Sequence, residues 1–420
     1  MSPPGRAAVA VAQGLDLSLP ARLRAARAIN AHSGSLLGPL ALDQALLRSR
    51  ALVKHPYGDR LWWTAEALEQ SSSYAVAVHR SHRYSDLARG TAEPVLDLGC
   101  SVGGDLLALA ATGPVVGVDL DQARLLLARA NTEALGLTAA LVRADLQRWE
   151  PPAGAVVFAD PARRAGGRRV FDPRHYTPSL DQVLGWAPTL RALGVKVAPG
   201  IDYTLLPAEI EVEIVSLNGD VKEAVLWAGD ARRGSPRMAT LLTSATTGSA
   251  ATDPGATDPG ATGPGASGGR PGRTVGPPRT LTGRGAPPPP VRPPGRYLLD
   301  LDGAVVRAHL VAEAAAEVGG WLLDPTIAYV SADAAVPTPW GRWYEVLETM
   351  PFGLKALRER LRAHDAGPLV VKKRGTAVEP DELRRRLRLK GSREVTVVLT
   401  RMSGRQVAMV VRPPRRTDPG

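Results

Sequence analysis

The chain contains very little cysteine and no long apolar run. It has 1 Cys among 420 residues, which excludes an internal disulfide framework and suits a reducing compartment. Polar and charged residues interrupt every stretch of about 20 residues, so a transmembrane helix is not expected. The same interruptions leave Ala7–Leu40 without the apolar core of a secretory signal. We therefore expect a cytoplasmic protein with no membrane partner.

Acidic side chains are scarce relative to basic ones. The 52 Lys and Arg outnumber the 41 Asp and Glu, which gives a formal charge of +11 and a pI of about 10.1. Such a surplus favours a polyanionic partner, and nucleic acid fits best. The alternative is a composition bias of a GC-rich genome, because Ala, Gly and Pro are abundant as well.

Composition and periodicity predict two domains in the first half of the chain. Residues 1–90 place leucine and alanine at helical spacing, and Trp62 and Trp63 are expected to pack this helical domain onto its neighbour. Residues 91–244 alternate strands with helices and end in an antiparallel hairpin. That order predicts an α/β fold with a doubly wound, Rossmann-like sheet and an antiparallel edge. The predicted strands are Val95–Gly99, Val115–Asp119, Ala140–Asp145, Ala155–Asp160, Val195–Pro199, Glu211–Leu217, Val221–Ala228 and Met238–Leu242.

The second half begins with a segment that has almost no apolar side chains. Residues 245–295 repeat Ala-Thr-Asp-Pro-Gly and continue through Gly, Pro and Arg, so they are predicted to be a disordered linker. Small α+β modules are expected at 296–364 and at 365–416. The last module is densely basic, which predicts a phosphate-binding surface rather than only a solvated face. Its candidate nucleic-acid-binding residues are Lys372, Lys373, Arg374 and Lys390.

The most informative motif is the glycine-rich turn that follows the first predicted strand. The run Asp97-Leu98-Gly99-Cys100-Ser101-Val102-Gly103 is typical of a turn whose backbone N–H groups approach a nucleotide-like ligand. Asp119 ends the next strand, close to the spacing of roughly 20 residues at which a carboxylate binds ribose hydroxyls. Neither Gly-x-Gly-x-x-Gly nor a Walker lysine accompanies the turn, which disfavours a dinucleotide or a triphosphate.

Two further acidic residues follow later predicted strands: Asp145 follows the third and Asp160 follows the fourth. Open α/β sheets bind ligands at these strand ends. With the turn and Asp119, they make residues 94–243 resemble a class I S-adenosylmethionine-dependent methyltransferase. The resemblance implies S-adenosylmethionine as cofactor, with Asp119 on the ribose and Asp145 on the adenine amino group; no metal is expected. The candidate cofactor-binding residues are Asp97, Gly99, Cys100, Ser101, Gly103, Asp119, Leu120, Asp145 and Leu146.

Two residues of the turn need separate interpretation. Ser101 stands where the resemblance expects glycine, which costs about 1 kcal/mol if the position requires a positive φ. Alternatively, its hydroxyl bonds the carboxylate of the ligand. Cys100 is interpreted as a small packed thiol rather than a nucleophile, because it lies in the cofactor turn.

The run Asp160-Pro161-Ala162-Arg163 follows the fourth strand and is similar to the Asp/Asn-Pro-Pro-aromatic motif of methyltransferases that modify amino groups in nucleic acids. The resemblance implies that Asp160 accepts a hydrogen bond from the acceptor amine; a plain helix cap is the alternative. The plane of Arg163 can stack on a base or hold a phosphate, and Tyr176 is a second candidate for the missing ring. The catalytic candidates are thus Asp160, Pro161 and Arg163, and the RNA-steering candidates are Arg164, Arg168 and Arg169.

Taken together, three sets of residues resemble bacterial methyltransferases with a THUMP-like C-terminal domain. They are Leu68-Glu69-Gln70 with His79-Arg80, Asp160 to Arg164, and Lys372-Lys373-Arg374-Gly375 with Leu389-Lys390-Gly391. The resemblance implies a helical N-terminal region, a methyltransferase core, a ferredoxin-like module and an RNA substrate. Our hypothesis is methylation of tRNA or rRNA at a base amino group. The alternatives are a methyltransferase for a small molecule or a protein, and a catalytically silent RNA-binding or ribosome-assembly factor.

Overall fold

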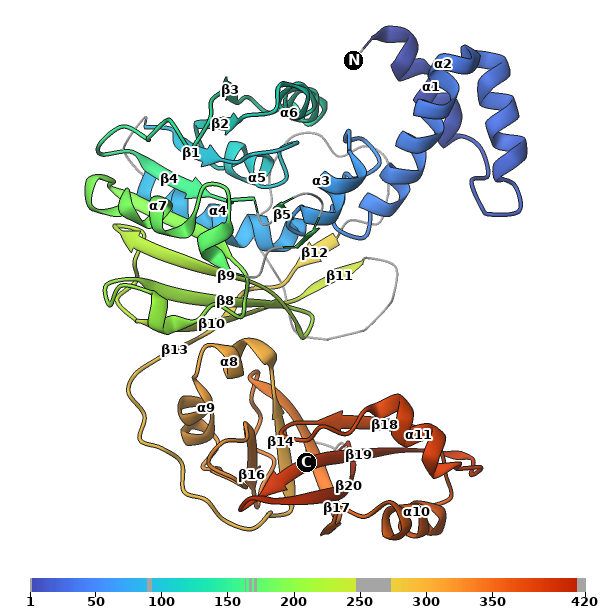
Figure 1. Ribbon diagram of the computed structural model, residues 1–420, viewed down its shortest axis with the longest axis vertical. Coiled ribbons are helices and arrows are strands. Elements are labelled where there is room, and N and C mark those ends of the chain that lie inside the picture. The colour runs from blue at the N-terminus through green and yellow to red at the C-terminus, as the bar shows by residue number, and fades with distance from the viewer. Residues whose placement is uncertain are drawn as a thin grey trace, which may run out of the picture. The chain divides into compact units, whose positions relative to one another are not determined.

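The computed structural model describes residues 2–88, 93–162, 164–165, 168–169, 172–246 and 273–413 (Figure 1). Two compact units make up the chain. The first comprises Met1–Glu211, Glu223–Gly234 and Leu242–Pro278, and the second comprises Val212–Lys222, Ser235–Leu241 and Arg279–Gly420. The glycine turn therefore belongs to the first unit, and the basic C-terminal segment belongs to the second.

Helices occupy the N-terminal region, as predicted. They are α1 (Pro3–Gln13), α2 (Arg22–Ala51), α3 (Ala65–Gln70) and α4 (Tyr74–Ala88). Helix α2 is kinked at Gly34, whose φ of 76° lies outside the helical region. Trp63 is buried in one apolar cluster with Val102 and Leu107 of the following domain. This cluster confirms that the tryptophan packs the helical region onto the sheet domain.

His55, just after α2, predicts a pH dependence of stability. Its ring is buried against Tyr57 and Tyr74, and its Nδ1 accepts a hydrogen bond from the backbone N–H of Tyr57 (3.2 Å). Burial lowers the pKa of His55 from 6.5 to about 4. Between these values the unfolded chain binds the proton and the folded chain does not. The free energy of unfolding should therefore fall by about 3 kcal/mol as the pH decreases from 6.5 to 4.

Denaturant unfolding of the wild type and of His55→Gln across this pH range measures that contribution. Other titrating groups contribute equally to both proteins, so the difference between the two curves isolates His55. Parallel curves would contradict the prediction.

Within the described ranges, the central sheet has nine strands in the order β13-β10-β8-β9-β7-β4-β1-β2-β3. Strands β3, β2, β1, β4 and β7 run parallel, and β9 is antiparallel to β7. In register, Leu98 of β1 is paired with Val118 of β2 and Ala159 of β4, so the turn after β1 lies between the ends of both neighbours. The doubly wound α/β fold with an antiparallel edge is thereby confirmed. The strands are β1 (Val95–Leu98), β2 (Val115–Asp119), β3 (Ala140–Arg143), β4 (Val156–Ala159), β7 (Ala192–Val197), β8 (Glu211–Leu217), β9 (Asp220–Gly229), β10 (Arg237–Leu242) and β13 (Arg279–Thr282).

Short elements connect these strands. The helices are α5 (Leu106–Ala110), α6 (Gln122–Ala134) and α7 (Leu180–Gly185), with 3₁₀ turns at Pro173–His175, Ala187–Thr189 and Tyr203–Leu205. Two small antiparallel pairs are β5 (Arg164–Ala165) with β6 (Arg168–Arg169) and β11 (Ser244–Thr246) with β12 (Arg273–Val275).

The predicted linker at 245–295 is wrong at its C-terminal end. Arg279–Thr282 forms β13, which pairs antiparallel with β10 and buries Leu281. The sequence signal was weak because Leu281 is a single apolar residue between two threonines. The strand is stabilised by its hydrogen bonds to β10, which lies far away in the sequence. Residues 247–272 lie outside the described residues, so the prediction for that part is neither supported nor contradicted.

The second sheet has seven strands in the order β15-β16-β14-β17-β20-β19-β18. The predicted boundary at residue 364 divides this one sheet, because β17 pairs with β14 on one side and with β20 on the other. Two separate modules are therefore not observed. The strands are β14 (Tyr297–Leu301), β15 (Trp321–Leu322), β16 (Tyr329–Ala332), β17 (Gly341–Pro351), β18 (Ala366–Lys373), β19 (Arg393–Met402) and β20 (Arg405–Arg412). The helices are α8 (Gly303–Arg307), α9 (Val311–Glu317), α10 (Leu354–Ala363) and α11 (Pro380–Leu387).

Candidate cofactor and acceptor site

The glycine turn adopts a conformation that ordinary side chains disfavour. Gly99 and Gly103 have φ of 86° and 96°, and Ser101 between them has φ of 51°. A Cβ at Gly99 would lie 2.7 Å from the backbone oxygen of Asp160, so only glycine allows the ends of β1 and β4 to approach this closely. Ser101 thus stands at a position with a positive φ, which strains a residue other than glycine by about 1 kcal/mol.

Asp119, at the end of β2, holds the turn in place. Its Oδ2 accepts a hydrogen bond from the backbone N–H of Ser101 (2.9 Å), and its Oδ1 accepts one from the backbone N–H of Asp121 (2.9 Å). A carboxylate offers about four acceptor positions, so both oxygens can still accept from a ligand hydroxyl. The structure thus gives Asp119 a role in the turn that the sequence did not reveal.

The other candidates at this edge differ in exposure. Leu120 is 57% exposed after β2, whereas Leu146 and Asp145 are half-buried after β3. The Oδ1 of Asp145 accepts a hydrogen bond from the backbone N–H of Gln147 (3.0 Å), and its carboxylate lies 3.8 Å from Arg148. The exposed leucine next to the buried Asp119 carboxylate is the kind of apolar surface that a flat ring can cover.

Cys100 and Asp97 are both buried at the base of the turn. Burial raises the pKa of the Cys100 thiol well above its usual value, so this thiol stays protonated and unreactive. Burial also raises the pKa of Asp97 well above its usual value, and the charges of Asp105 and Asp160 raise it further. Within the described part of the chain, neither carboxyl oxygen of Asp97 has a hydrogen-bond partner.

A buried charge cluster that the sequence did not predict surrounds Asp160. Lys196, from β7, donates to Oδ2 of Asp160 (2.7 Å) and lies 3.9 Å from Asp105. Arg80, from α4, pairs with Asp105 (2.5 Å) and with Glu223 (2.7 Å). Lys196 and Arg80 are 4% and 3% exposed.

The charges in this cluster keep both cations protonated. Burial lowers the pKa of Lys196, but Asp160 and Asp105 outweigh this effect and raise it overall. The same balance raises the pKa of Arg80, where the opposing charges are Asp105 and Glu223. A lysine in the otherwise apolar run of β7 was the one signal in the sequence that could have revealed this cluster.

Asp160 has a described partner on only one of its two carboxylate oxygens. Its side chain is 24% exposed; Lys196 occupies Oδ2, and no described residue donates to Oδ1. The following Pro161 is buried, and Ala162 exchanges two backbone hydrogen bonds with Thr177. Asp160 does not cap a helix, because a β-bridge follows it. Tyr176 is only 4% exposed, so the prediction that its ring could stack on an acceptor is wrong.

The arginines predicted around this site cannot be placed. Arg163 lies outside the described residues, and for Arg164, Arg168 and Arg169 only the backbone pairing of β5 with β6 is described.

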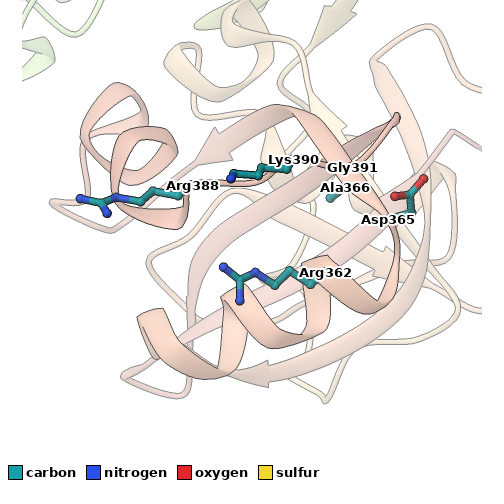
Figure 2. A pocket seen from close by; sticks show the side chains of 6 residues that line it. All are labelled: Arg362, Asp365, Ala366, Arg388, Lys390 and Gly391. Atoms are coloured by element: carbon teal, nitrogen blue, oxygen red, sulfur yellow. The ribbon is translucent and has the colours of Figure 1, made fainter.

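Three of the four basic candidates in the second unit are engaged in ion pairs. Lys372 and Arg374 both bind Asp300 (2.7 and 3.0 Å), and Lys373 binds Glu379 (2.7 Å). Their side chains are about one-quarter to one-third exposed. Lys390 is exposed and lines a cavity with Arg362, Arg388 and Asp365 (Figure 2).

The described residues contain neither a cluster of metal ligands nor a membrane-spanning helix. Across the described ranges, no group of three or more His, Cys, Asp or Glu side chains could hold a metal ion. No helix in the part of the chain that the structure describes is long and apolar enough to span a bilayer.

Comparison with known proteins gives two family matches. Residues 95–159 match the methyltransferase domain, and residues 341–413 match the THUMP domain-like family. The second match starts within β17, well before the boundary predicted at residue 365, which agrees with the continuous second sheet.

Similar proteins cover nearly the whole chain. An uncharacterized S-adenosylmethionine-dependent methyltransferase of Mycobacterium tuberculosis, found in two strains, is 39% identical over 392 residues, which are 90% of this chain and 98% of that protein. A crystal structure of a Porphyromonas gingivalis protein with a methyltransferase assignment superposes with a TM-score of 0.69. It is 19% identical and covers 98% of this chain and 99% of its own, so it supports the fold alone.

Proposed function

Because this chain belongs to the S-adenosylmethionine-dependent methyltransferases, we propose that its acceptor is RNA, methylated at an exocyclic amino group of a base. The cofactor and the reaction class follow from the family. The acceptor is our inference, and it rests on the C-terminal unit and on Asp160.

The distribution of charge is the observation that carries the RNA proposal. The THUMP-like stretch 341–413 contains 17 Lys or Arg and 8 Asp or Glu, a net +9 out of +11 for the chain. The remaining residues are nearly balanced, with 35 basic and 33 acidic side chains. A GC-rich genome would spread arginine along the whole chain, so composition bias does not account for the clustering. Positive charge concentrated in one domain is the electrostatic pattern of a protein that binds phosphates.

The first unit provides groups that fit S-adenosylmethionine. The glycine turn brings backbone N–H groups to the end of β1, and the exposed Leu120 offers an apolar face for a ring. The buried carboxyl oxygens of Asp97 have no hydrogen-bond partner among the described residues, a state that costs about 1–3 kcal/mol and that a polar group of a ligand would relieve. When bound, the cofactor supplies an electrophilic methyl group. Asp119, with acceptor positions still available, would hold the ribose.

Asp160 and Lys196 would orient the acceptor. Because Lys196 occupies Oδ2, the lone pairs of Oδ1 are left for an N–H of the acceptor amine. That hydrogen bond would direct the nitrogen lone pair toward the methyl group, and a fixed approach of this kind is a large part of catalysis. Lys196 acts through Asp160 and is therefore a positioning residue.

A nucleoside comparison tests the proposed acceptor. Digested tRNA and rRNA from the parent strain and from a strain that lacks this protein are compared by mass spectrometry. One methylated nucleoside should be missing from the deletion strain and restored by the wild-type gene, but not by the Asp160→Ala variant. RNA from the deletion strain should also accept methyl groups from labelled S-adenosylmethionine when the purified protein is present. Identical nucleoside profiles would refute an RNA acceptor and favour a small molecule or a protein.

A further inference from the structure

The positive side chains of the THUMP-like domain differ in whether they are neutralised. Many are held in ion pairs, as Lys373 is with Glu379 and Arg386 is with Glu382. Arg362, Arg388 and Lys390 are exposed and form no ion pair with a described acidic side chain, and the same holds for Arg342, Lys355, Arg385 and Arg405. The first three differ from the others because they line one cavity of about 370 Å³, together with Asp365, Ala366 and Gly391. Three unpaired cations are therefore gathered around a single hollow that an external anion can enter.

The backbone around this cavity is closely fixed. Gly391 approaches Asp365 so closely that a Cβ at Gly391 would overlap the backbone oxygen of Asp365. Its backbone N–H donates to the backbone oxygen of Ala366 (2.9 Å), and the backbone N–H of Arg393 donates to that of Asp365 (3.0 Å). The segment that carries Lys390 is thus anchored beside the end of α10, which carries Arg362. Cations on a fixed backbone lose less entropy when they bind a ligand.

The side chains are arranged so that two cations share one side of the cavity. Figure 2 shows the head groups of Arg362 and Lys390 on the same side of the cavity, one above the other, while Arg388 extends farther out. Asp365 lies at the opposite side in this view. Its carboxylate accepts from the hydroxyl and the backbone N–H of Ser392 (2.6 and 3.3 Å), and these hydrogen bonds lower its pKa. Asp365 therefore carries a negative charge at the edge of the cavity, but it is bound to Ser392 and forms no ion pair with Arg362, Arg388 or Lys390.

We infer that Arg362 and Lys390, supported by Arg388, form a binding site for a backbone phosphate of the RNA acceptor. An arginine fork and a lysine ammonium are the side chains that bind phosphate oxygens most favourably. The inference rests on the proposed RNA acceptor and adds the site at which the RNA backbone is held. It favours these side chains over Lys372, Lys373 and Arg374 as the main contacts, because each of those three already forms an ion pair with Asp300 or Glu379.

Two double variants of the full chain with equal charge change test this site. Arg362→Gln with Lys390→Gln removes two unpaired cations, whereas Lys373→Gln with Arg386→Gln removes two paired cations from the same domain. Binding of fluorescently labelled tRNA and rRNA fragments is measured at several salt concentrations. The first variant should raise the Kd about tenfold and lower the slope of log K against log salt by about 0.7–0.9, which is the contribution of the one phosphate contact that both cations make. The second should change the Kd less than about threefold.

Each outcome has a distinct meaning. Equal changes in the two variants would overturn the phosphate site, while RNA binding and methylation by the wild type would leave the proposed function standing. If the wild type neither binds nor methylates RNA, the proposed function fails first, and the site fails with it. If inorganic phosphate at moderate concentration displaces the RNA only from proteins that retain Arg362 and Lys390, the site binds phosphate as inferred. Melting curves of both variants exclude unfolding as the cause.

Discussion

The Asp160→Asn variant is expected to lose about 100-fold in the rate of methyl transfer, and adding Lys196→Met should restore at least about tenfold. Lys196 can only donate, so it would bind the oxygen of the new amide at the place where it binds Oδ2 in the wild type. The amide NH₂ would then face the N–H of the acceptor amine. Because both groups are hydrogen-bond donors, the acceptor would lose the hydrogen bond that orients it. Without the lysine, the amide can rotate and offer its oxygen to the acceptor.

Initial rates with labelled S-adenosylmethionine and RNA from the deletion strain measure this effect. Lys222→Met is the matched control, because Lys222 forms an exposed pair with Asp220 and should rescue nothing when combined with Asp160→Asn. Cofactor affinity, measured by calorimetry, should be similar in all the variants, which separates positioning from general damage. Wild-type activity in Asp160→Asn, or equal rescue by both lysine variants, would be incompatible with the proposed geometry.

The Arg80→Met variant is expected to lower the melting temperature of the first unit by roughly 10 °C, since breaking a buried ion pair costs about 3–5 kcal/mol. The cause is that Asp105 and Glu223 would both remain buried without their shared cation. The guanidinium also lies over the ring of Phe158 (4.5 Å), so the variant loses that contact as well.

Arg124→Met is the control for this experiment. Arg124 binds Glu66 at 3.0 Å, but this pair is partly exposed to solvent, and surface pairs contribute about 0–1 kcal/mol. Scanning calorimetry of both variants and the wild type gives the two shifts directly. Equal shifts would show that the cluster around Arg80 does not stabilise the folded state.

The positions of the turn and of the strand ends were predictable because their signals are local. Asp97, Asp119 and Asp160 each follow a short apolar run, and such runs in alternation with helices specify parallel strands. The carboxyl ends of those strands must then meet at one edge of the sheet. Strands β1, β2 and β4 accordingly lie within one residue of their predicted bounds.

The partners of these residues were not predictable in the same way. Lys196 and Arg80 lie 36 and 80 positions from Asp160 along the sequence. Their contact with one carboxylate cluster depends on how α4 and β7 pack, which no local pattern encodes. The same reason explains why the ion pairs of Lys372 and Arg374 were not foreseen, because their shared partner Asp300 belongs to β14. A basic run shows where positive charge is present, but not whether it is free.

The sequence by itself determined the order of the strands and helices of the methyltransferase domain up to β10, the place of the glycine turn and the basic character of the C-terminal domain. These properties depend on apolar periodicity, glycine and net charge, which are properties of short segments. Only the tertiary structure decided which charges are paired, which oxygen of Asp160 Lys196 binds, and that the C-terminal modules share one sheet. Pairing and burial depend on contacts between segments far apart in the chain, and desolvation gives those contacts their energy.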